Sequence, residues 1–206
     1  MARTNWEVTR EMFLDEAEVG RLLQRLREPV GTRTGRQRAI AMLDQFIVEG
    51  LLYSGLRNSE FCQLTLADTC LGHGQPAFRV AGAGQSGRTV FLPDALNRLV
   101  RQYVEQVRPH FLPAGVAPDD LGQALVFNER RQPYERTGLY RRVVRILTGA
   151  GLKDRASVQL LRHTYGYLAY LKTGGNLLFV QQQLGHAHPM VTVVYARFVR
   201  ESYADL

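Results

Sequence analysis

The chain has 206 residues, with 26 Lys or Arg against 19 Asp or Glu, so its formal net charge is +7. This length favours one domain, or at most two small ones, and is long enough to bury a hydrophobic core. Hydrophobic residues make up 45% of the chain and charged residues 22%, which excludes the composition of a disordered protein. No apolar run approaches the ~18 residues that a membrane span needs, and residues 1–20 lack the apolar centre of a signal peptide. We therefore expect a cytoplasmic protein without a membrane segment.

Two helices are predicted in the first quarter of the chain. Apolar residues recur at helical spacing from Asp15 to Arg27, with acids at the start, where the helix dipole favours them. The stretch 29–35 (PVGTRTG) is expected to break this helix. A second helix is predicted over residues 36–53 and is closed by Ser54-Gly55. A short helix over residues 59–64 follows.

A β-hairpin is predicted between Thr69 and Leu92, where the runs AFRV and RTVFLP are separated by glycines. Residues 109–122 are rich in Pro and Gly and are expected to form a loop. The other predicted helices cover residues 94–108, 137–148, 157–172, 176–184 and 190–202. The predicted fold class is mainly α with a small antiparallel β-sheet (α+β).

Cysteine and lysine are both scarce. Cys62 and Cys70 cannot build a disulfide framework, and the absence of a CxxC pair argues against a structural zinc site. Lys153 and Lys172 are the only lysines among the 26 basic residues. Arg is the better bidentate phosphate ligand, but a high-GC genome would produce the same bias. Composition alone therefore identifies no partner.

Positive charge is concentrated in one part of the chain. Residues 129–162 contain nine basic residues against three acids, a net +6. Such a cluster is typical of a nucleic-acid-binding surface, and a solvated basic face is the alternative interpretation. The candidate DNA-binding residues are Arg130, Arg131, Arg136, Arg141, Arg142 and Arg145.

Three short segments carry residue types suited to chemistry. Residues 55–60 read GLRNSE, residues 161–164 read LRHT, and residues 184–186 read LGH, with Tyr195 nine positions after the histidine. Taken singly, each has an ordinary explanation, such as a solvent-facing Arg in a turn or a His that only packs. Arg162 lies in an apolar helix, and because an unpaired buried charge costs several kcal/mol, we expect it to meet an anion. That anion is either internal or a bound ligand.

The order and spacing of the three segments together resemble the catalytic domain of the tyrosine site-specific recombinases, the integrase family. The resemblance runs from about Leu14 to Val199 and includes the GxG hairpin of Gly82 and Gly84. It implies that residues 1–206 form one catalytic domain without the N-terminal core-binding domain. The short fimbrial phase-switch recombinases have this organisation, and an isolated catalytic domain is the alternative.

The resemblance also implies roles for individual residues. Arg57 and Arg162 would donate bidentate hydrogen bonds to a phosphorane, and His186 would add another. Tyr195 would attack the phosphorus and hold the strand as a 3′-phosphotyrosine ester, so that rejoining needs no metal, ATP or other cofactor. Glu60 would brace Arg57, although an acid that favours a helix N-terminus is the alternative. Arg88 is a further supporting residue that could stabilise charge.

Two positions depart from the family pattern. The family's hairpin lysine, a general acid, is replaced by Ala83, and the histidine of its H-x-x-R motif is replaced by Gln159. Gln159 remains a candidate catalytic residue, because its amide can hydrogen-bond the phosphate, but it cannot shuttle protons near neutral pH. General acid–base catalysis is typically worth ~10²–10⁴-fold. We therefore predict a slow recombinase or one with another proton donor, for which His188 is a candidate.

Two other functions remain as alternatives. The first is a catalytically weakened integrase-like DNA-binding regulator, and the second is a generic helical DNA-binding module, in which Arg57→Ala would leave DNA affinity unchanged. The expected partner is double-stranded DNA. In the family the tail after the tyrosine docks on a neighbouring protomer and gives a tetramer on DNA, while intramolecular docking fits this sequence equally well.

Overall fold

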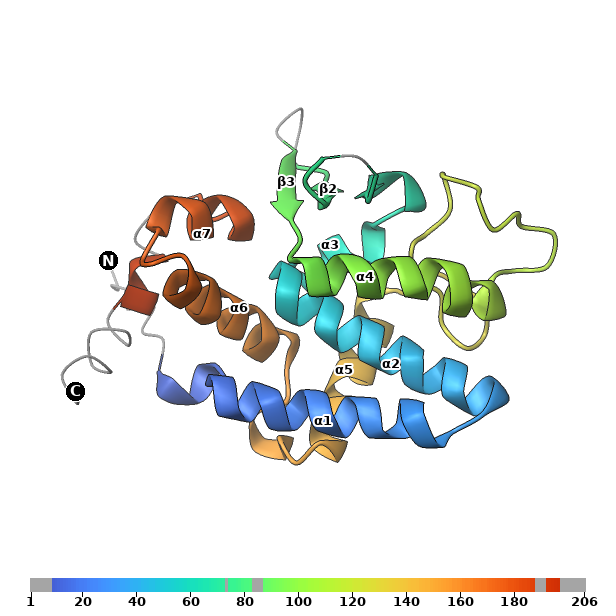
Figure 1. The fold of residues 1–206 in the computed structure, drawn as a ribbon, viewed down its shortest axis with the longest axis horizontal. Coiled ribbons are helices and arrows are strands. Elements are labelled where there is room, and N and C mark those ends of the chain that lie inside the picture. Colours follow the sequence, from blue (N-terminus) through green and yellow to red (C-terminus); the bar gives the residue numbers. More distant parts are fainter. Residues whose placement is uncertain (1–8, 73, 83–86, 188–191, 197–206) are drawn as a thin grey trace.

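The computed structural model describes residues 9–72, 74–82, 87–187 and 192–196. Two long helices, α1 (Glu16–Thr32) and α2 (Gly35–Ser54), open the fold after a 3₁₀ turn η1 (Arg10–Met12). Helix α2 runs through the middle of the molecule and packs against α1, α6 (Val158–Lys172), α4 (Asp94–Gln102) and α5 (Arg136–Gly149) (Figure 1). Its second half is apolar and buried, and it forms the centre of the main hydrophobic core.

Helix ends are set by local sequence signals. Asp15 and Glu18 form a capping box at the start of α1: the Asp15 carboxylate accepts from the Glu18 amide at 2.7 Å, and the Glu18 carboxylate accepts from the Asp15 amide at 2.9 Å. Gly55 ends α2 in the left-handed conformation with φ +64°. Gly185 ends α7 (Leu177–Leu184) in the same way, also with φ +64°. Both glycines lie beside the candidate site.

The β-structure is larger than the predicted hairpin. Strands β2 (Ala77–Val80) and β3 (Arg88–Phe91) pair antiparallel, with Phe78 opposite Val90. A short strand β1 (Thr69–Cys70) adds to the outer edge of β2, so the sheet has three strands in the order β1-β2-β3. A two-residue strand is too short to leave an alternating pattern in the sequence. In Figure 1 the sheet stands beside α7, and β3 contacts α7 directly.

The remaining elements connect these layers. Helix α3 (Asn58–Gln63) follows α2 and contacts α5, and a 3₁₀ turn η2 (Leu66–Asp68) leads into the sheet. Another 3₁₀ turn, η5 (Lys153–Arg155), joins α5 to α6. Residues 192–196 are helical, and the rest of the helix predicted over 190–202 lies outside the described residues. The predicted class, mainly α with a small antiparallel sheet, is confirmed.

Two predicted boundaries were wrong. Helix α1 continues through Pro29 to Thr32, and the Arg33 amide still bonds to the Pro29 carbonyl at 3.1 Å. Proline removes one backbone donor, but in the last turns of a helix that packs along α2 this loss does not end the helix. The helix predicted over 94–108 ends at Gln102 and continues as a π turn η3 (Tyr103–Val107) and a 3₁₀ turn η4 (Arg108–Phe111). Tyr103 is buried there and stacks on Phe46 at 3.9 Å between ring centroids.

Candidate active site

The first motif places a carboxylate between two arginines. Glu60 lies in the first turn of α3, where its carboxylate accepts from the Arg57 amide at 2.7 Å. Nη1 of Arg57 and Nη1 of Arg88 both donate to Oε1 of Glu60 at 2.7 Å, and Nη2 of Arg88 donates to Oε2 at 2.8 Å. Burial alone would raise the pKa of Glu60, but the hydrogen bonds from Arg88 and Arg57 outweigh it and hold the pKa at about 2. Glu60 is therefore ionised at neutral pH.

Arg162 from the second motif is buried beside this group. Only 6% of the residue is exposed, and its two terminal nitrogens donate to the carbonyls of Gly55 and Leu184, the latter at 2.7 Å. Burial lowers the pKa of Arg162 to about 10, and the positive charges of Arg57 and Arg88 act in the same direction. The guanidinium keeps its charge at neutral pH. A guanidinium carries five N–H donors, so the two carbonyls leave donors available for an anion.

The C-terminal end of α7 brings the three arginines together. The carbonyls of Gln183, Leu184 and Gly185 accept hydrogen bonds from Arg88 (3.0 Å), Arg162 (2.7 Å) and Arg57 (2.9 Å), respectively. The last carbonyls of a helix lack partners within the helix and carry the negative end of its dipole, so they attract cations. Three guanidinium groups from three separate segments thus converge around one carboxylate. The group has a net positive charge suited to an anion with several oxygens.

His186 lies next to this group. Its Nδ1 is 3.0 Å from Oγ1 of Thr192. Burial, together with the charges of Arg162 and Arg57, lowers the pKa of His186 to about 4. The imidazole is therefore neutral at physiological pH and can donate only the proton of one ring nitrogen. Arg57, Arg88 and His186 line a cavity of about 750 Å³ between the sheet and α7.

Tyr195 lies near α6, the helix that carries Arg162. Its ring packs against α6 at Gly166, where an added Cβ would lie only 2.4 Å from the tyrosine Cζ. The phenol oxygen is 3.0 Å from Nδ1 of His163. Tyr195 is only 1% exposed, and burial raises its pKa to about 12, although the charge of Arg162 opposes this shift. The phenol is therefore protonated at neutral pH.

Gln159 is not part of the arginine cluster. Its side chain is exposed, one helical turn before His163 on α6, and both residues line a cavity of about 630 Å³ with Glu11, Asp154 and Arg155. Ala83 and His188 lie outside the described residues, and Gly82, just before Ala83, lines the arginine-rich cavity. Among the residues that the structure describes, no three His, Cys, Asp or Glu side chains are grouped so that they could hold a metal ion.

The six arginines between 130 and 145 divide into two groups. Arg130, Arg131, Arg136, Arg141 and Arg145 are exposed. Arg142 is not a surface residue, which corrects the prediction that it faces DNA: its Nε donates to Asp44 and its Nη1 to Glu129, both at 2.6 Å, and only 8% of the residue is exposed. Arg142 lies on the inner face of α5, so its charge holds α5 to α2.

Arg136 is joined through its backbone to the segment that carries Arg57. Its backbone carbonyl at the start of α5 accepts from Nδ2 of Asn58 at 2.8 Å, and Asn58 directly follows Arg57.

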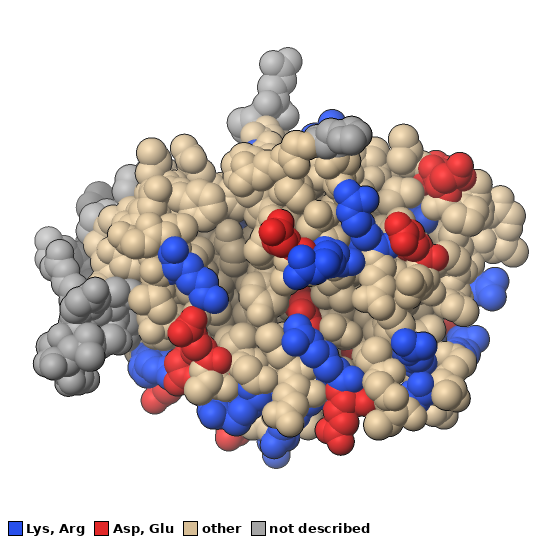
Figure 2. All heavy atoms as spheres, viewed as in Figure 1, with Lys and Arg blue, Asp and Glu red and all other residues tan. Residues whose placement is uncertain are grey.

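The charges on the face shown in Figure 2 are mixed. Basic and acidic side chains alternate over the face that carries α1, α2 and α4, and no patch of one sign spans it (Figure 2).

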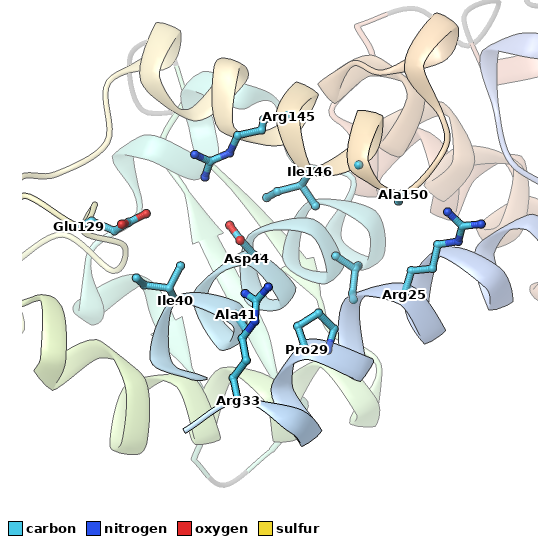
Figure 3. A pocket seen from close by; sticks show the side chains of 12 residues that line it. Arg25, Pro29, Arg33, Ile40, Ala41, Asp44, Glu129, Arg145, Ile146 and Ala150 are labelled. Carbon is cyan, nitrogen blue, oxygen red and sulfur yellow. The ribbon is translucent and has the colours of Figure 1, made fainter. Parts of the chain in front are cut away.

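A second group of charges surrounds another cavity. Arg25, Arg33 and Arg145 lie around a space of about 510 Å³ with Asp44 and Glu129 (Figure 3). Burial raises the pKa of Asp44, and the nearby Arg142 opposes this shift only in part. Three arginines and two acids are among the described residues that line this cavity, a net charge of +1, and none of the three sequence motifs contributes to it.

Sequence reasoning overlooked two features of the site. His163 was visible as the residue after Arg162, but nothing in the spacing linked it to Tyr195, which is 32 positions away. The backbone carbonyls at the end of α7 carry no side-chain signal, and only the left-handed Gly185 marks where they are exposed.

Known proteins match this chain in sequence and in fold. A family model described as the Phage integrase family matches residues 12–201. Tyrosine recombinase XerC of Halalkalibacterium halodurans is 29% identical over 194 residues, which cover 94% of this chain and 60% of that protein. Tyrosine recombinase XerD of Staphylococcus aureus is 30% identical over 152 residues, which cover 74% of this chain and 49% of that protein. The chain thus matches only about half to three fifths of the length of these relatives.

A solved structure has the same fold. The post-cleavage complex of the XerH site-specific recombinase with a palindromic difH substrate superposes with a TM-score of 0.74 at 22% sequence identity. The superposition covers 94% of this chain and 51% of that one.

Proposed function

This chain belongs to the phage integrase family of tyrosine recombinases, and from that membership we propose that it cuts and rejoins DNA at specific sites through a 3′-phosphotyrosine intermediate. The observation that carries the proposal is the convergence of Arg57, Arg88 and Arg162 at the end of α7, beside His186 and with Tyr195 packed against α6, the helix that carries Arg162. A phosphodiester in transfer gains negative charge on its non-bridging oxygens, and fixed guanidinium donors stabilise that charge. The relatives XerC and XerD, both called tyrosine recombinases, and the DNA complex of XerH support the same activity.

The residues have distinct roles in this reaction. Arg57 and Arg162 bind the non-bridging oxygens, and Glu60 holds Arg57 and Arg88 in place through its carboxylate. Neutral His186 donates one further hydrogen bond. Tyr195 supplies the nucleophilic oxygen, and the ester bond that it forms keeps the energy of the broken phosphodiester, so that a 5′ hydroxyl can reverse the step without ATP.

Double-stranded DNA is the proposed partner. Its phosphates would be contacted outside the reaction centre by the exposed arginines Arg130, Arg131, Arg136, Arg141 and Arg145. We place the protein in the cytoplasm, where such DNA is accessible. The structure has no membrane-spanning helix among its described residues. Assembly into a tetramer on DNA through the tail remains part of the proposal, and residues 197–206 of that tail lie outside the described residues.

Covalent trapping tests the proposal. Wild-type protein and Tyr195→Phe are incubated with nicked DNA fragments that tile the gene's own genomic neighbourhood, and SDS-resistant protein–DNA adducts are counted. A nick close to the cleaved bond leaves only a short fragment with the free 5′ hydroxyl, which diffuses away. Rejoining is then prevented and the adduct accumulates. We expect an adduct with wild type and none with Tyr195→Phe.

A second function is favoured by Ala83 and Gln159, which lack the proton-transfer groups of the family pattern. If the wild type binds a fragment specifically but never forms an adduct, the protein is a DNA-binding regulator that has kept the phosphate site. If Arg57→Ala and Arg162→Ala also leave the affinity unchanged, the arginine cluster takes no part in binding and both proposals fail.

A further inference from the structure

The contact between His163 and Tyr195 joins two groups that the proposed reaction needs. The phenol oxygen lies 3.0 Å from Nδ1 of the imidazole, and the two rings are tilted by 55° with centroids 6.2 Å apart. His163 follows Arg162 directly on α6, so one helical segment carries both a phosphate-binding guanidinium and the partner of the tyrosine. Within the described part of the chain, the imidazole is the hydrogen-bond partner of the phenol.

The protonation states suit a transfer from oxygen to nitrogen. Burial lowers the pKa of His163, and the charge of Arg162 adds to that effect, so the imidazole is neutral at physiological pH. In the tautomer with its proton on Nε2, Nδ1 accepts the phenol hydrogen. The other titratable or charged groups near His163 are Glu11 from η1, Asp154 and Arg155 from η5, and His186 just after α7.

We propose that His163 is the catalytic base that takes the proton from Tyr195 as the phosphotyrosine bond forms. This assignment rests on the proposed function and identifies the proton acceptor of its first step. The family pattern has a histidine where this chain has Gln159, whose amide cannot take up a proton near neutral pH. Gln159 and His163 line the same cavity. His163 therefore supplies an imidazole one helical turn away from the position that holds a histidine in the family pattern.

Proton transfer accompanies the exchange of oxygen partners at phosphorus. The O–H bond of Tyr195 breaks and its proton moves to the lone pair of Nδ1 of His163. The phenol oxygen forms a bond to phosphorus, and the bond from phosphorus to the 5′ oxygen breaks. The electron pair leaves with the 5′ oxygen, which takes a proton from water. The imidazolium then passes its extra proton to water in the cavity of about 630 Å³ that His163 lines.

The experiment compares wild type with His163→Asn on nicked DNA, once with the normal 5′ oxygen and once with sulfur at the leaving position. Asparagine retains a hydrogen-bonding group close to the site of Nδ1 but cannot take up a proton. We expect adduct formation to slow by about 10²–10⁴-fold on both substrates. A 5′ thiolate departs without being protonated. The sulfur substrate therefore restores the rate of a variant that lacks the general acid, but not that of a variant that lacks the general base.

The pH profile separates this role from a structural one. Wild type should reach a plateau once His163 is neutral, whereas His163→Asn should speed up by about tenfold per pH unit between pH 7 and 9, because the phenol then has to ionise by itself. His163→Ala with added imidazole gives a second test, in which we expect partial rescue. Far-UV circular dichroism and DNA affinity of both variants confirm that they are folded.

Four results would overturn the assignment. An unchanged rate and pH profile in His163→Asn would show that the imidazole is not the base. Faster adduct formation in His163→Asn would show that the hydrogen bond only restrains Tyr195. A defect repaired by the sulfur substrate would place His163 at the leaving group instead. If wild type forms no adduct with either substrate on DNA that it binds, the proposed cleavage itself fails and the assignment fails with it.

Discussion

Glu60 is the residue whose charge keeps the arginine cluster in place. It accepts hydrogen bonds from Arg57 and Arg88, and among the described side chains that line the cavity it is the one acid. Without it, three guanidinium groups would face one another with only backbone carbonyls between them. The carboxylate therefore contributes both to stability and to the arrangement of the donors.

Glu60→Gln should lower the free energy of unfolding at pH 7 by at most roughly 3 kcal/mol, since each unit of pKa shift is worth about 1.4 kcal/mol. The folded pKa of about 2 lies below the ordinary value of 4.5, so this contribution is present above pH 4.5 and is lost as the pH falls toward 2. Urea unfolding of both proteins at several pH values measures it. The two stability curves should converge at low pH, and a constant difference would contradict this account.

Wild type and Glu60→Gln should both begin to lose stability at a higher pH than the one at which Glu60 is protonated. The pKa of His186 and that of His163 are lowered in the fold from an ordinary value of 6.5. The unfolded chain therefore takes up protons first, and stability falls as the pH decreases below about 6.5 in wild type and in Glu60→Gln alike.

Gly166 determines where the tyrosine ring lies. A Cβ there would come within 2.4 Å of the Tyr195 ring. Gly166→Ala should displace the phenol from His163 and slow adduct formation by about tenfold or more, because small misplacements of reacting groups are costly. Gly20→Ala is the control, since Gly20 lies in α1 with open space around it. It should only stabilise, by about 0.5–1 kcal/mol. Equal adduct rates in the two variants would show that the contact at Gly166 is unimportant.

At the scale of elements, the end of α7 organises the site. Gly185 has φ +64°, and a Cβ there would lie 2.9 Å from Nη1 of Arg88. Gly174 has nearly the same conformation, φ +63°, with nothing within 4 Å. Either glycine to alanine change forces a residue into the left-handed region, at a cost of about 1–2 kcal/mol. The two positions therefore differ in their neighbours rather than in their backbone.

Gly185→Ala should weaken DNA binding in addition to stability, because Arg88 has to move away from the Gln183 carbonyl. Gly174→Ala should lose stability alone. Urea unfolding and fluorescence anisotropy with a bound DNA fragment measure the two effects. Equal DNA affinity in both variants would mean that the position of Arg88 does not matter for binding.

Most of the elements could be predicted from the sequence. Apolar spacing located α1 and α2, the predicted bounds of α5 and α6 were within one residue of those observed, and Gly55 marked the end of α2 correctly. The errors arose where tertiary packing outweighs local signals, as at Pro29 within α1 and at the π turn that begins at Tyr103. Strand β1 was missed because two residues carry no periodicity.

At the scale of the whole molecule, motifs separated by more than 100 residues meet at one place. Arg162 donates to the carbonyl of Gly55, 107 positions earlier in the chain, and Arg57 donates to that of Gly185, 128 positions later. Motif spacing predicted that these residues belong together, but it could not predict which atoms they contact. Arg142 shows the opposite limit, because charge counting cannot distinguish a surface arginine from one buried between Asp44 and Glu129.

The exposed and buried arginines of α5 should behave differently with DNA. Arg136→Ala should reduce the slope of log K against log salt by about 0.9, the loss of one phosphate contact. Arg98→Ala removes the same charge from an exposed position on α4 and should leave the slope unchanged. Arg142→Ala should instead destabilise the fold by about 3–5 kcal/mol, because it leaves Asp44 and Glu129 without their partner. If Arg98→Ala and Arg136→Ala change the slope equally, DNA binding does not favour the α5 surface.

The central claim is that Tyr195 and the arginine cluster form one phosphodiester-transfer site, and the chemical identity of a trapped adduct tests it most directly. Adduct from nicked DNA is digested with nuclease and protease, and mass spectrometry locates the remaining nucleotide. The account predicts a nucleotide 3′-phosphate on the peptide that contains Tyr195, and none from Arg162→Ala. A nucleotide on any other residue, or one joined through a 5′-phosphate, would contradict it.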